Sequence, residues 1–166
     1  PIESLREAAA GRTEDGRPFP ALWRTRMAQG AAFMRDAQIA RSGRASARIE
    51  GGAVATGPDA AFAIAPLDPG VRPGDRSTVT AFARAGSRCG EIRVALRWFA
   101  SDGRAVAGAQ SAPIRCDTRS WQRLRASGTA PAGAAYVGLY LRAAGTVGPA
   151  WFDDVSYSCS RRAGSS

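Results

Sequence analysis

Residues 91–110, EIRVALRWFASDGRAVAGAQ, decide the fold class of this chain. Apolar and polar side chains alternate along the first ten residues, and a period of two is the pattern of a strand with one buried face. The predicted core face carries Ile92, Val94, Leu96 and Trp98, whereas the predicted outer face carries Arg93, Arg97 and Phe99.

The Asp102-Gly103 pair in the middle of this stretch predicts a tight hairpin. Glycine tolerates the positive φ that a two-residue turn requires, so Ser101 is expected opposite Arg104. The stretch therefore predicts two antiparallel neighbours with a defined register.

The same register, extended away from the turn, places Cys89 opposite Cys116. A disulfide there fits a secreted protein. Pro113 interrupts the ladder on the way, so two free buried thiols remain the alternative. Cys159 is left over in either case.

The rest of the chain after residue 42 consists of similar short runs separated by Gly, Pro and Asp. The intervals lack room for crossover helices, so the pattern predicts an all-β antiparallel sandwich or barrel. The eight predicted strands include SARIE, AFAIAP, STVTAFARA, EIRVALRWFA, AVAGAQSAPI, WQRLRASG, AYVGLYLRA and AWFDDVSYS.

The ends of the chain differ from this pattern. Residues 1–40 predict a short irregular or helical segment that packs on the sandwich and covers Phe82, an outward-facing aromatic residue. Residues 41–159 form the predicted sandwich, and residues 160–166 read as a linker or frayed tail. The chain is thus one domain.

Composition excludes several functions. All 23 basic residues are arginines, the formal net charge is +9, and the chain has no histidine or lysine. Histidine-dependent triads and lysine Schiff-base chemistry are therefore excluded. The basic surface is either ordinary solvated surface or the partner of an acidic ligand. The dispersed arginines argue against nucleic acid, and no apolar run reaches the ~20 residues of a membrane span.

Five motifs in order resemble the jelly-roll carbohydrate-binding modules of the family 4/9/22 type. They are SGRASARIE, PGDRSTVTAFARA, VALRWFASDGRAV, SWQRLRASGTAPAGAAYVGLYLRAAG and AWFDDVSYS, and the resemblance covers about residues 20–158. It implies a two-sheet jelly roll. One sheet would contain strands 46–50, 150–158, 78–85 and 121–127, and the other strands 61–65, 135–143, 91–100 and 105–112. Trp23 and Trp121 match positions that pack in the core of that family.

The resemblance also implies a ligand face on the second, concave sheet. Phe99 and Tyr140 would stack on sugar rings, and arginine forks and an amide would bind hydroxyl or acid groups. The alternative is an ordinary solvent face. The predicted ligand-binding residues are Arg93, Arg97, Phe99, Gln110, Tyr136, Tyr140 and Arg142.

Two adjacent acids, Asp153 and Asp154, interrupt the last strand. Asp153 shares the parity of Val155 and is expected to face the core, whereas Asp154 is expected at the surface. The resemblance implies a structural calcium ion on Asp153 with Glu14 or Asp15, because hard oxygen ligands suit calcium. Alternatively, Asp153 caps backbone amides or pairs with an arginine. Adjacent strand residues point to opposite faces, so the two acids cannot act as a catalytic pair.

These observations predict a non-catalytic, monomeric carbohydrate-binding module of a secreted bacterial protein. It would bind a polysaccharide, with an acidic uronan as the first choice because of the exposed arginines. It would also anchor a catalytic domain of the same polypeptide to that polymer. The alternative is a structural or protein-interaction sandwich domain without glycan affinity.

Overall fold

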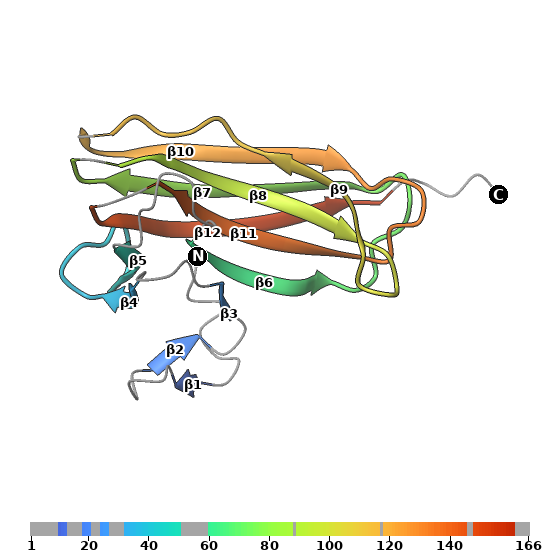
Figure 1. Cartoon of the computed structure of the whole chain (residues 1–166), viewed down its shortest axis with the longest axis horizontal. Coiled ribbons are helices and arrows are strands. Elements are labelled where there is room, and N and C mark those ends of the chain that lie inside the picture. Colours follow the sequence, from blue (N-terminus) through green and yellow to red (C-terminus); the bar gives the residue numbers. More distant parts are fainter. Residues whose placement is uncertain are drawn as a thin grey trace.

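The computed structural model describes residues 10–12, 18–20, 24–26, 32–50, 60–87, 89–116, 118–145 and 148–161. These residues form two stacked antiparallel sheets, as Figure 1 shows. No helix in the described part of the chain is long and apolar enough to cross a membrane.

The first sheet, here the β8 sheet, has the order β3-β6-β11-β8-β9. Its strands are β3 (Arg24–Arg26), β6 (Ala60–Asp68), β11 (Tyr136–Ala144), β8 (Glu91–Phe99) and β9 (Ala105–Gln110). The second, the β7 sheet, has the order β10-β7-β12-β5-β4. Its strands are β10 (Thr118–Thr129), β7 (Arg76–Ala85), β12 (Ala150–Ser160), β5 (Ser46–Glu50) and β4 (Ala32–Asp36).

The predicted all-β sandwich is confirmed, including the division of the eight predicted strands between two sheets. The segment before residue 41 contributes more strand than expected. Strand β4 pairs with β5 and strand β3 pairs with β6, each at a sheet edge. Strands β1 (Ala10–Arg12) and β2 (Pro18–Pro20) form a separate two-stranded ribbon. Residues 1–9, the start of the segment predicted to be irregular or helical, and Trp23 lie outside the described residues.

The core lies between the two sheets and consists of the inward residues of each strand. Its largest fully buried side chains are Trp98 of β8 and Phe152 of β12, one from each sheet. A Cβ atom at Gly128 of β10 would lie 2.6 Å from the indole of Trp98. Glycine at this position therefore leaves the room that the indole fills. Trp121, expected to pack in the core, is only half-buried.

The β8–β9 hairpin differs from the predicted two-residue turn. Ala100, not Ser101, pairs with Arg104: its N–H donates to the Arg104 carbonyl at 2.9 Å. Gly103 has a φ of +85°, which closes a three-residue loop. The ladder then shifts by one residue, which leaves Val106 as a bulge. The bulge compensates for the longer loop, so the predicted register returns beyond it.

Cys89 and Cys116 are joined by a disulfide at the end of the hairpin farthest from the turn, with Cα atoms 5.5 Å apart. The bridge closes a loop with a sequence separation of 27 residues. Cys159 is a free thiol that is half-buried. The sequence-derived pairing and the structure agree because the bulge restores the register.

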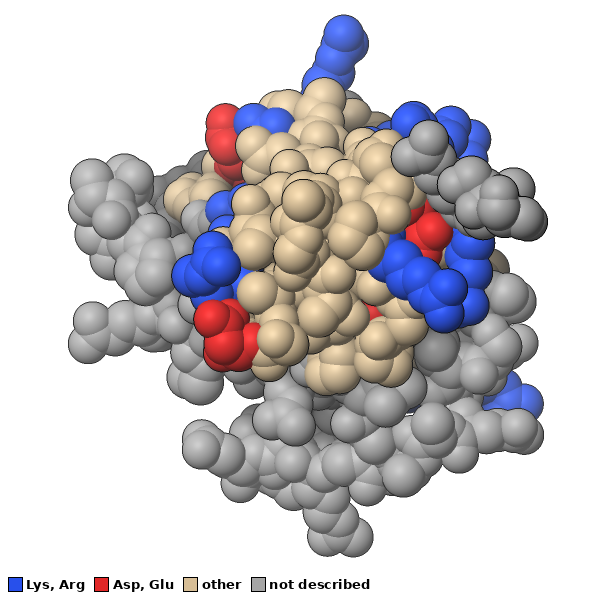
Figure 2. Space-filling model, turned by 90° about the vertical axis from the view of Figure 1, so that its right-hand side faces the viewer, with Lys and Arg blue, Asp and Glu red and all other residues tan. Residues whose placement is uncertain are grey.

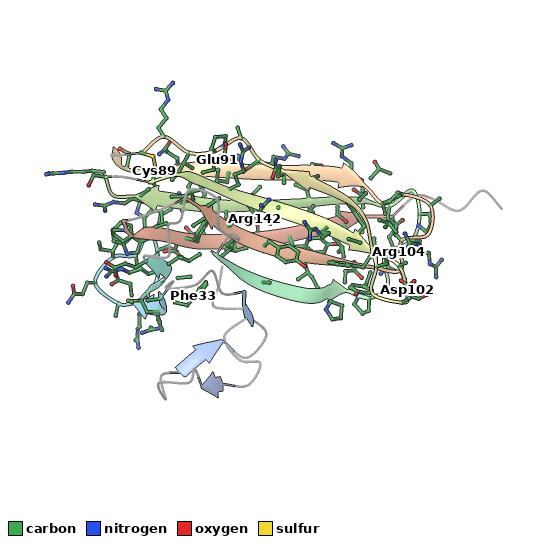
Figure 3. All side chains as sticks on the ribbon, viewed as in Figure 1. Phe33, Cys89, Glu91, Asp102, Arg104 and Arg142 are labelled. Carbon is green, nitrogen blue, oxygen red and sulfur yellow. A yellow bond between two sulfur atoms is a disulfide. The ribbon has the colours of Figure 1, made fainter. Side chains whose placement is uncertain are left out.

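The end of the sandwich on the right of Figure 1 carries the β8–β9 hairpin and points toward the C-terminus. Figure 2 shows an uncharged centre at this end, with both basic and acidic side chains around it. The charged residues Asp102 and Arg104 of the hairpin loop also lie at this end (Figure 3).

Candidate functional site

The seven predicted ligand-binding residues lie together on the outer face of the β8 sheet. Three adjacent strands supply them, and the pairing register aligns them in cross-strand rows. From β11 across β8 to β9, the rows are Tyr136–Phe99, Gly138–Arg97–Gly108, Tyr140–Ala95–Gln110 and Arg142–Arg93. The sequence pattern predicted this grouping because each residue has the opposite parity to the core residues of its strand.

Two of the aromatic rings form a stacked pair. The ring centroids of Phe99 and Tyr136 lie 5.0 Å apart, and the ring planes are 12° from parallel. Cross-strand aromatic pairs of this kind stabilise a sheet and hold each other in place. Both side chains are half-buried, so each retains some ring surface toward solvent.

The ring of Tyr140 is less open than a sugar platform requires. Tyr140 is 8% exposed and packs with Ala63, Ala95 and Phe99 on this outer face. The guanidinium of Arg97 lies 5.8 Å from the ring centroid. Small alanines on both neighbouring strands let larger side chains close over the tyrosine. The structure therefore differs from the expectation that Tyr140 is an open platform, and Arg97 is the exposed group above it.

The three arginines of this face have different environments. The Arg93 guanidinium binds Glu91, with 3.0 Å from Nη2 to Oε1, and donates to the Ser111 carbonyl at 2.8 Å. Arg142 donates to Oε1 of Gln110 at 3.0 Å. Figure 3 shows Glu91 and Arg142 on this part of the sheet. Arg93 and Arg142 are thus oriented by neighbours.

Glu91 is the residue of this face that the sequence analysis missed. Hydrogen bonds from Arg93, and then its charge, hold the pKa of the Glu91 carboxyl below its usual range. Glu91 lies two residues before Arg93 on the same strand, and this spacing could have placed it on the same face. Within the described parts of β6, β8, β9 and β11, it is the only carboxylate on the outer face.

Phe82 lies on the opposite outer face, that of the β7 sheet. The Arg41 guanidinium lies 3.5 Å from the centroid of its ring. Residues 1–40 were expected to cover this ring, but among the described residues the cover comes from Arg41, in the β4–β5 connection. A cation above an aromatic face is an attractive contact.

Asp153 does not face the core, which corrects the expectation from strand parity. It pairs with Phe82 of β7, whereas Ser156 pairs with Thr80, so a β-bulge lies between them. Asp154 sits in the bulge with a φ of +47°. The extra residue reverses the parity of the strand, so Asp153 points outward with Phe82 while Val155 still packs in the core.

The Asp153 carboxylate is nevertheless 2% exposed, because the β4–β5 connection folds over it. Its Oδ2 accepts the backbone N–H groups of Arg41 at 2.7 Å and Ser42 at 3.2 Å. Its Oδ1 accepts the N–H of Asp154 at 2.8 Å. Asp153 thus ties this connection to the bulge in β12 by capping backbone amides.

Asp154 is half-buried rather than exposed as expected. It accepts hydrogen bonds from the Arg41 guanidinium and the Ser42 hydroxyl. Burial raises the pKa of this carboxyl, but those two groups outweigh burial and hold it below the usual range.

A third acid, Asp36, anchors the start of the same connection. It is 8% exposed and accepts the indole N–H of Trp151 at 2.8 Å and the N–H of Gln38 at 2.8 Å. Burial raises the pKa of Asp36, but the Trp151 and backbone hydrogen bonds and the charge of Arg48 bring it below its usual value.

The described residues around Asp153 do not form a calcium site. Its oxygens already accept three N–H groups, and the carboxylate of the adjacent Asp154 is paired with the cation of Arg41. No cluster of three or more Asp, Glu, His or Cys side chains exists in the described part of the chain. Glu14 and Asp15, the other predicted ligands, lie outside it, and the calcium prediction remains a prediction.

No protein-family model matches the chain, and no curated protein matches it. Solved structures with a similar fold were found. The CBM22-1 xylan-binding domain of Paenibacillus barcinonensis Xyn10C has a TM-score of 0.62 at 14% identity, covering 85% of this chain and 87% of that one.

Two other similar structures come from different settings. The enzymatically active domain of bacteriophage CBA120 tailspike protein 4 has a TM-score of 0.60 at 16% identity; the match covers 84% of this chain and only 19% of that one. A cyclase from Fischerella sp. TAU has a TM-score of 0.59 at 15% identity, covering 85% of each chain. The chain therefore has the jelly-roll fold found in carbohydrate-binding modules, a fold that these comparisons also place in other proteins.

Proposed function

We propose that this chain is a non-catalytic carbohydrate-binding module that binds a polysaccharide on the outer face of the β8 sheet. The observation that carries this proposal is the alignment of aromatic rings, guanidinium groups and an amide across three adjacent strands. The similarity to a xylan-binding domain supports the same function, although fold alone does not determine function.

The arrangement suits a glycan chemically. The half-buried stack of Phe99 and Tyr136 offers apolar surface for the C–H faces of a sugar ring. The exposed guanidinium of Arg97 lies beside it and can donate two parallel hydrogen bonds to a carboxylate or to neighbouring hydroxyl groups. An acidic uronan therefore remains the preferred polymer, with neutral xylan or β-glucan second.

Binding rather than hydrolysis follows from the carboxylates of this face. Glycoside hydrolysis commonly uses two carboxyl groups on opposite sides of the scissile bond. In the described strands of this sheet, Glu91 is the outward carboxylate, and it is engaged with Arg93. We accordingly infer that the chain supports a catalytic domain rather than acting on the polymer itself.

The Cys89–Cys116 disulfide supports the proposal of a secreted protein, because such bridges persist mainly in oxidising compartments. Attachment to a polysaccharide-degrading enzyme would raise that enzyme's effective concentration on the polymer.

Native affinity electrophoresis against neutral and uronic polysaccharides tests the proposal. We expect retardation by one polymer that persists at high salt, and a roughly tenfold weaker affinity for Phe99→Ala and Arg97→Ala. Phe99→Leu keeps the apolar volume but removes the flat ring, so it should weaken binding as well. Arg44→Ala removes an exposed charge from the β4–β5 connection and serves as the control. Unchanged binding in both Phe99 variants, or no retardation by any polymer, would favour a structural or protein-interaction domain.

A further inference from the structure

The outer face of the β7 sheet has a composition that the proposed function does not use. The core-facing residues of β7, β10 and β12 are apolar apart from Ser77, Gln122 and Tyr157, whereas the outward residues of their middle and distal portions are hydroxyl-bearing or arginine side chains. This hydroxyl–arginine face consists of Arg76, Thr78, Thr80, Arg123, Arg125, Ser127, Thr129, Ser156, Ser158 and Ser160.

The strand register arranges these residues in cross-strand rows. One row contains Thr129, Arg76 and Ser160, the next Ser127, Thr78 and Ser158, and the third Arg125, Thr80 and Ser156. Arg123 follows beside Phe82. Alternate residues of a strand lie roughly 7 Å apart, and neighbouring strands lie about 5 Å apart, so the rows form a flat array.

The hydroxyl groups pair with one another across the strands. Thr78 Oγ1 lies 2.8 Å from Ser127 Oγ, and Thr80 Oγ1 lies 2.6 Å from Ser156 Oγ. A hydroxyl has one donor and two acceptor positions, so each pair retains capacity for a further partner. The central rows are therefore ordered by the sheet and still able to hydrogen-bond a ligand.

The arginines of this face have no partner in the described part of the chain. Arg76, Arg123 and Arg125 are exposed, and none has an ion-pair or hydrogen-bond partner for its guanidinium within the described residues. The nearest acids on these strands are Asp153, which is buried against backbone N–H groups, and Asp154, which is paired with Arg41. This face therefore presents positive charge, and no carboxylate among its described residues is free to neutralise that charge.

The β8 sheet is different in this respect. Arg93 is held by Glu91, Arg142 binds Gln110, and Arg97 lies over Tyr140. The two outer faces point in opposite directions from the sandwich, as the stacked sheets of Figure 1 show. One polymer chain lying flat on the β8 sheet cannot reach the hydroxyl–arginine face.

We propose that the hydroxyl–arginine face is a second binding surface, which takes an extended glycan bearing carboxylate or sulfate groups. Guanidinium forks match those anions, and the hydroxyl rows between them match sugar hydroxyls. A protein partner fits less well because the central rows offer no apolar centre to desolvate. Nucleic acid fits less well because Phe82, the aromatic ring nearest these rows, is covered by Arg41, whereas base stacking needs an open ring.

The test compares two double variants of the full chain that remove equal charge. Arg123→Gln with Arg125→Gln changes the proposed surface, whereas Arg35→Gln with Arg44→Gln removes two exposed arginines at or near the opposite edge of the same sheet. The probes are polygalacturonate, dextran sulfate and neutral xylan, titrated at low and at physiological salt, with thermal unfolding as the check of folding.

The first variant should bind at least one of the two polyanions roughly tenfold more weakly than the parent chain, with a smaller salt dependence. The matched control should stay close to the parent. Polygalacturonate and dextran sulfate distinguish carboxylate from sulfate as the recognised group. Equal weakening in both double variants would show attraction by net charge alone and would overturn the proposal.

Two further measurements separate this surface from others. Thr80→Val with Ser156→Ala nearly preserves the side-chain shapes and leaves the charge unchanged. It should weaken polyanionic glycan binding by about threefold, because it removes two hydroxyl groups of the central rows. Duplex DNA that competes as well as the glycan per unit charge would overturn glycan recognition. Phe99→Ala should retain polyanion binding on the hydroxyl–arginine face even where the β8 sheet loses its ligand. The proposed function and the second binding surface can therefore fail independently.

Discussion

Arg41 places its guanidinium 3.5 Å from the ring centroid of Phe82, while its side chain also binds Asp154 and its backbone N–H caps Asp153. One residue thus closes the β4–β5 connection over the outer face of the β7 sheet. The contacts join parts of the chain 112 residues apart in sequence. The connection is held to the sheet mainly by polar groups rather than by core packing.

Removal of the Arg41 side chain should therefore loosen this connection. Arg41→Ala uncovers the Phe82 ring and removes the cation beside Asp154, so we expect a loss of roughly 1 kcal/mol in the free energy of unfolding. Urea denaturation measures it. Arg44→Ala, in the same connection and exposed, should change stability little. Equal stability of Arg41→Ala and the parent chain would contradict a structural role for the contact.

Asp153 should stabilise the fold through its backbone hydrogen bonds without a metal ion. Asp153→Asn keeps the shape but removes the charge that accepts three N–H groups, so we expect a loss of about 1–3 kcal/mol. The loss should be the same in EDTA and in calcium. A melting temperature of the parent chain that rises markedly with calcium would instead support the calcium site predicted with Glu14 or Asp15.

Acid should destabilise the protein partly through Asp36. Burial raises its pKa, but hydrogen bonds from Trp151 and the backbone bring it below 3.8, the ordinary value. A carboxyl with a depressed folded-state pKa contributes stability that is complete above the unfolded-state pKa and is lost as the pH falls through the folded value. Urea denaturation between neutral pH and pH about 3 follows this loss.

Trp151→Phe supplies the comparison for that experiment. It removes the indole donor, so the folded-state pKa of Asp36 should be less depressed. The stability that depends on Asp36 ionisation should then be smaller, and its loss should be complete at a higher pH than in the parent chain. An acid-denaturation profile identical in shape to that of the parent chain would mean that the Trp151 hydrogen bond does not hold the charge of Asp36.

Gly128 should tolerate no side chain. A Cβ atom there would lie 2.6 Å from the Trp98 indole, which is buried and cannot withdraw into solvent, so Gly128→Ala should cost about 1–3 kcal/mol. Gly70→Ala, whose Cβ would meet its neighbours at 3.4 Å, is the control and should be nearly neutral. Calorimetric melting of both variants checks this, and equal melting temperatures would refute the packing argument.

Reduction of the disulfide should destabilise the sandwich. Cys89→Ser with Cys116→Ser opens a loop with a sequence separation of 27 residues, so we expect a loss of roughly 3 kcal/mol. Cys159→Ser leaves the bridge intact and serves as the control. A reducing agent should lower the melting temperature of the parent chain but not that of the double variant.

Local alternation was sufficient to predict the eight strands after residue 42 and the set of outward residues on the β8 sheet. The period of two is a property of each strand alone, and Ile92, Val94, Leu96 and Trp98 all face the core as that period requires. The division into two sheets was implied by the resemblance of the motifs to jelly-roll carbohydrate-binding modules. The hairpin register also survived because the Val106 bulge compensated for the longer turn.

Contacts between distant parts of the chain decided the rest. A single bulge at Asp154 places Asp153 on the outer face of the sheet instead of the core face. No local sequence pattern predicts this bulge. The burial of Tyr140 depends on alanines from two neighbouring strands and on Arg97 closing above it.

The free charge of the molecule was decided in the same way. The composition gives the number of arginines but not their partners. The tertiary structure shows that Arg93 forms an ion pair with Glu91, whereas Arg123 and Arg125 have no ion-pair partner among the described residues. The face on which a side chain lies follows from the backbone of its own strand. Its ion-pair partners, its burial by neighbouring side chains and the positions of bulges depend on which strands pair. That information is spread over the whole chain.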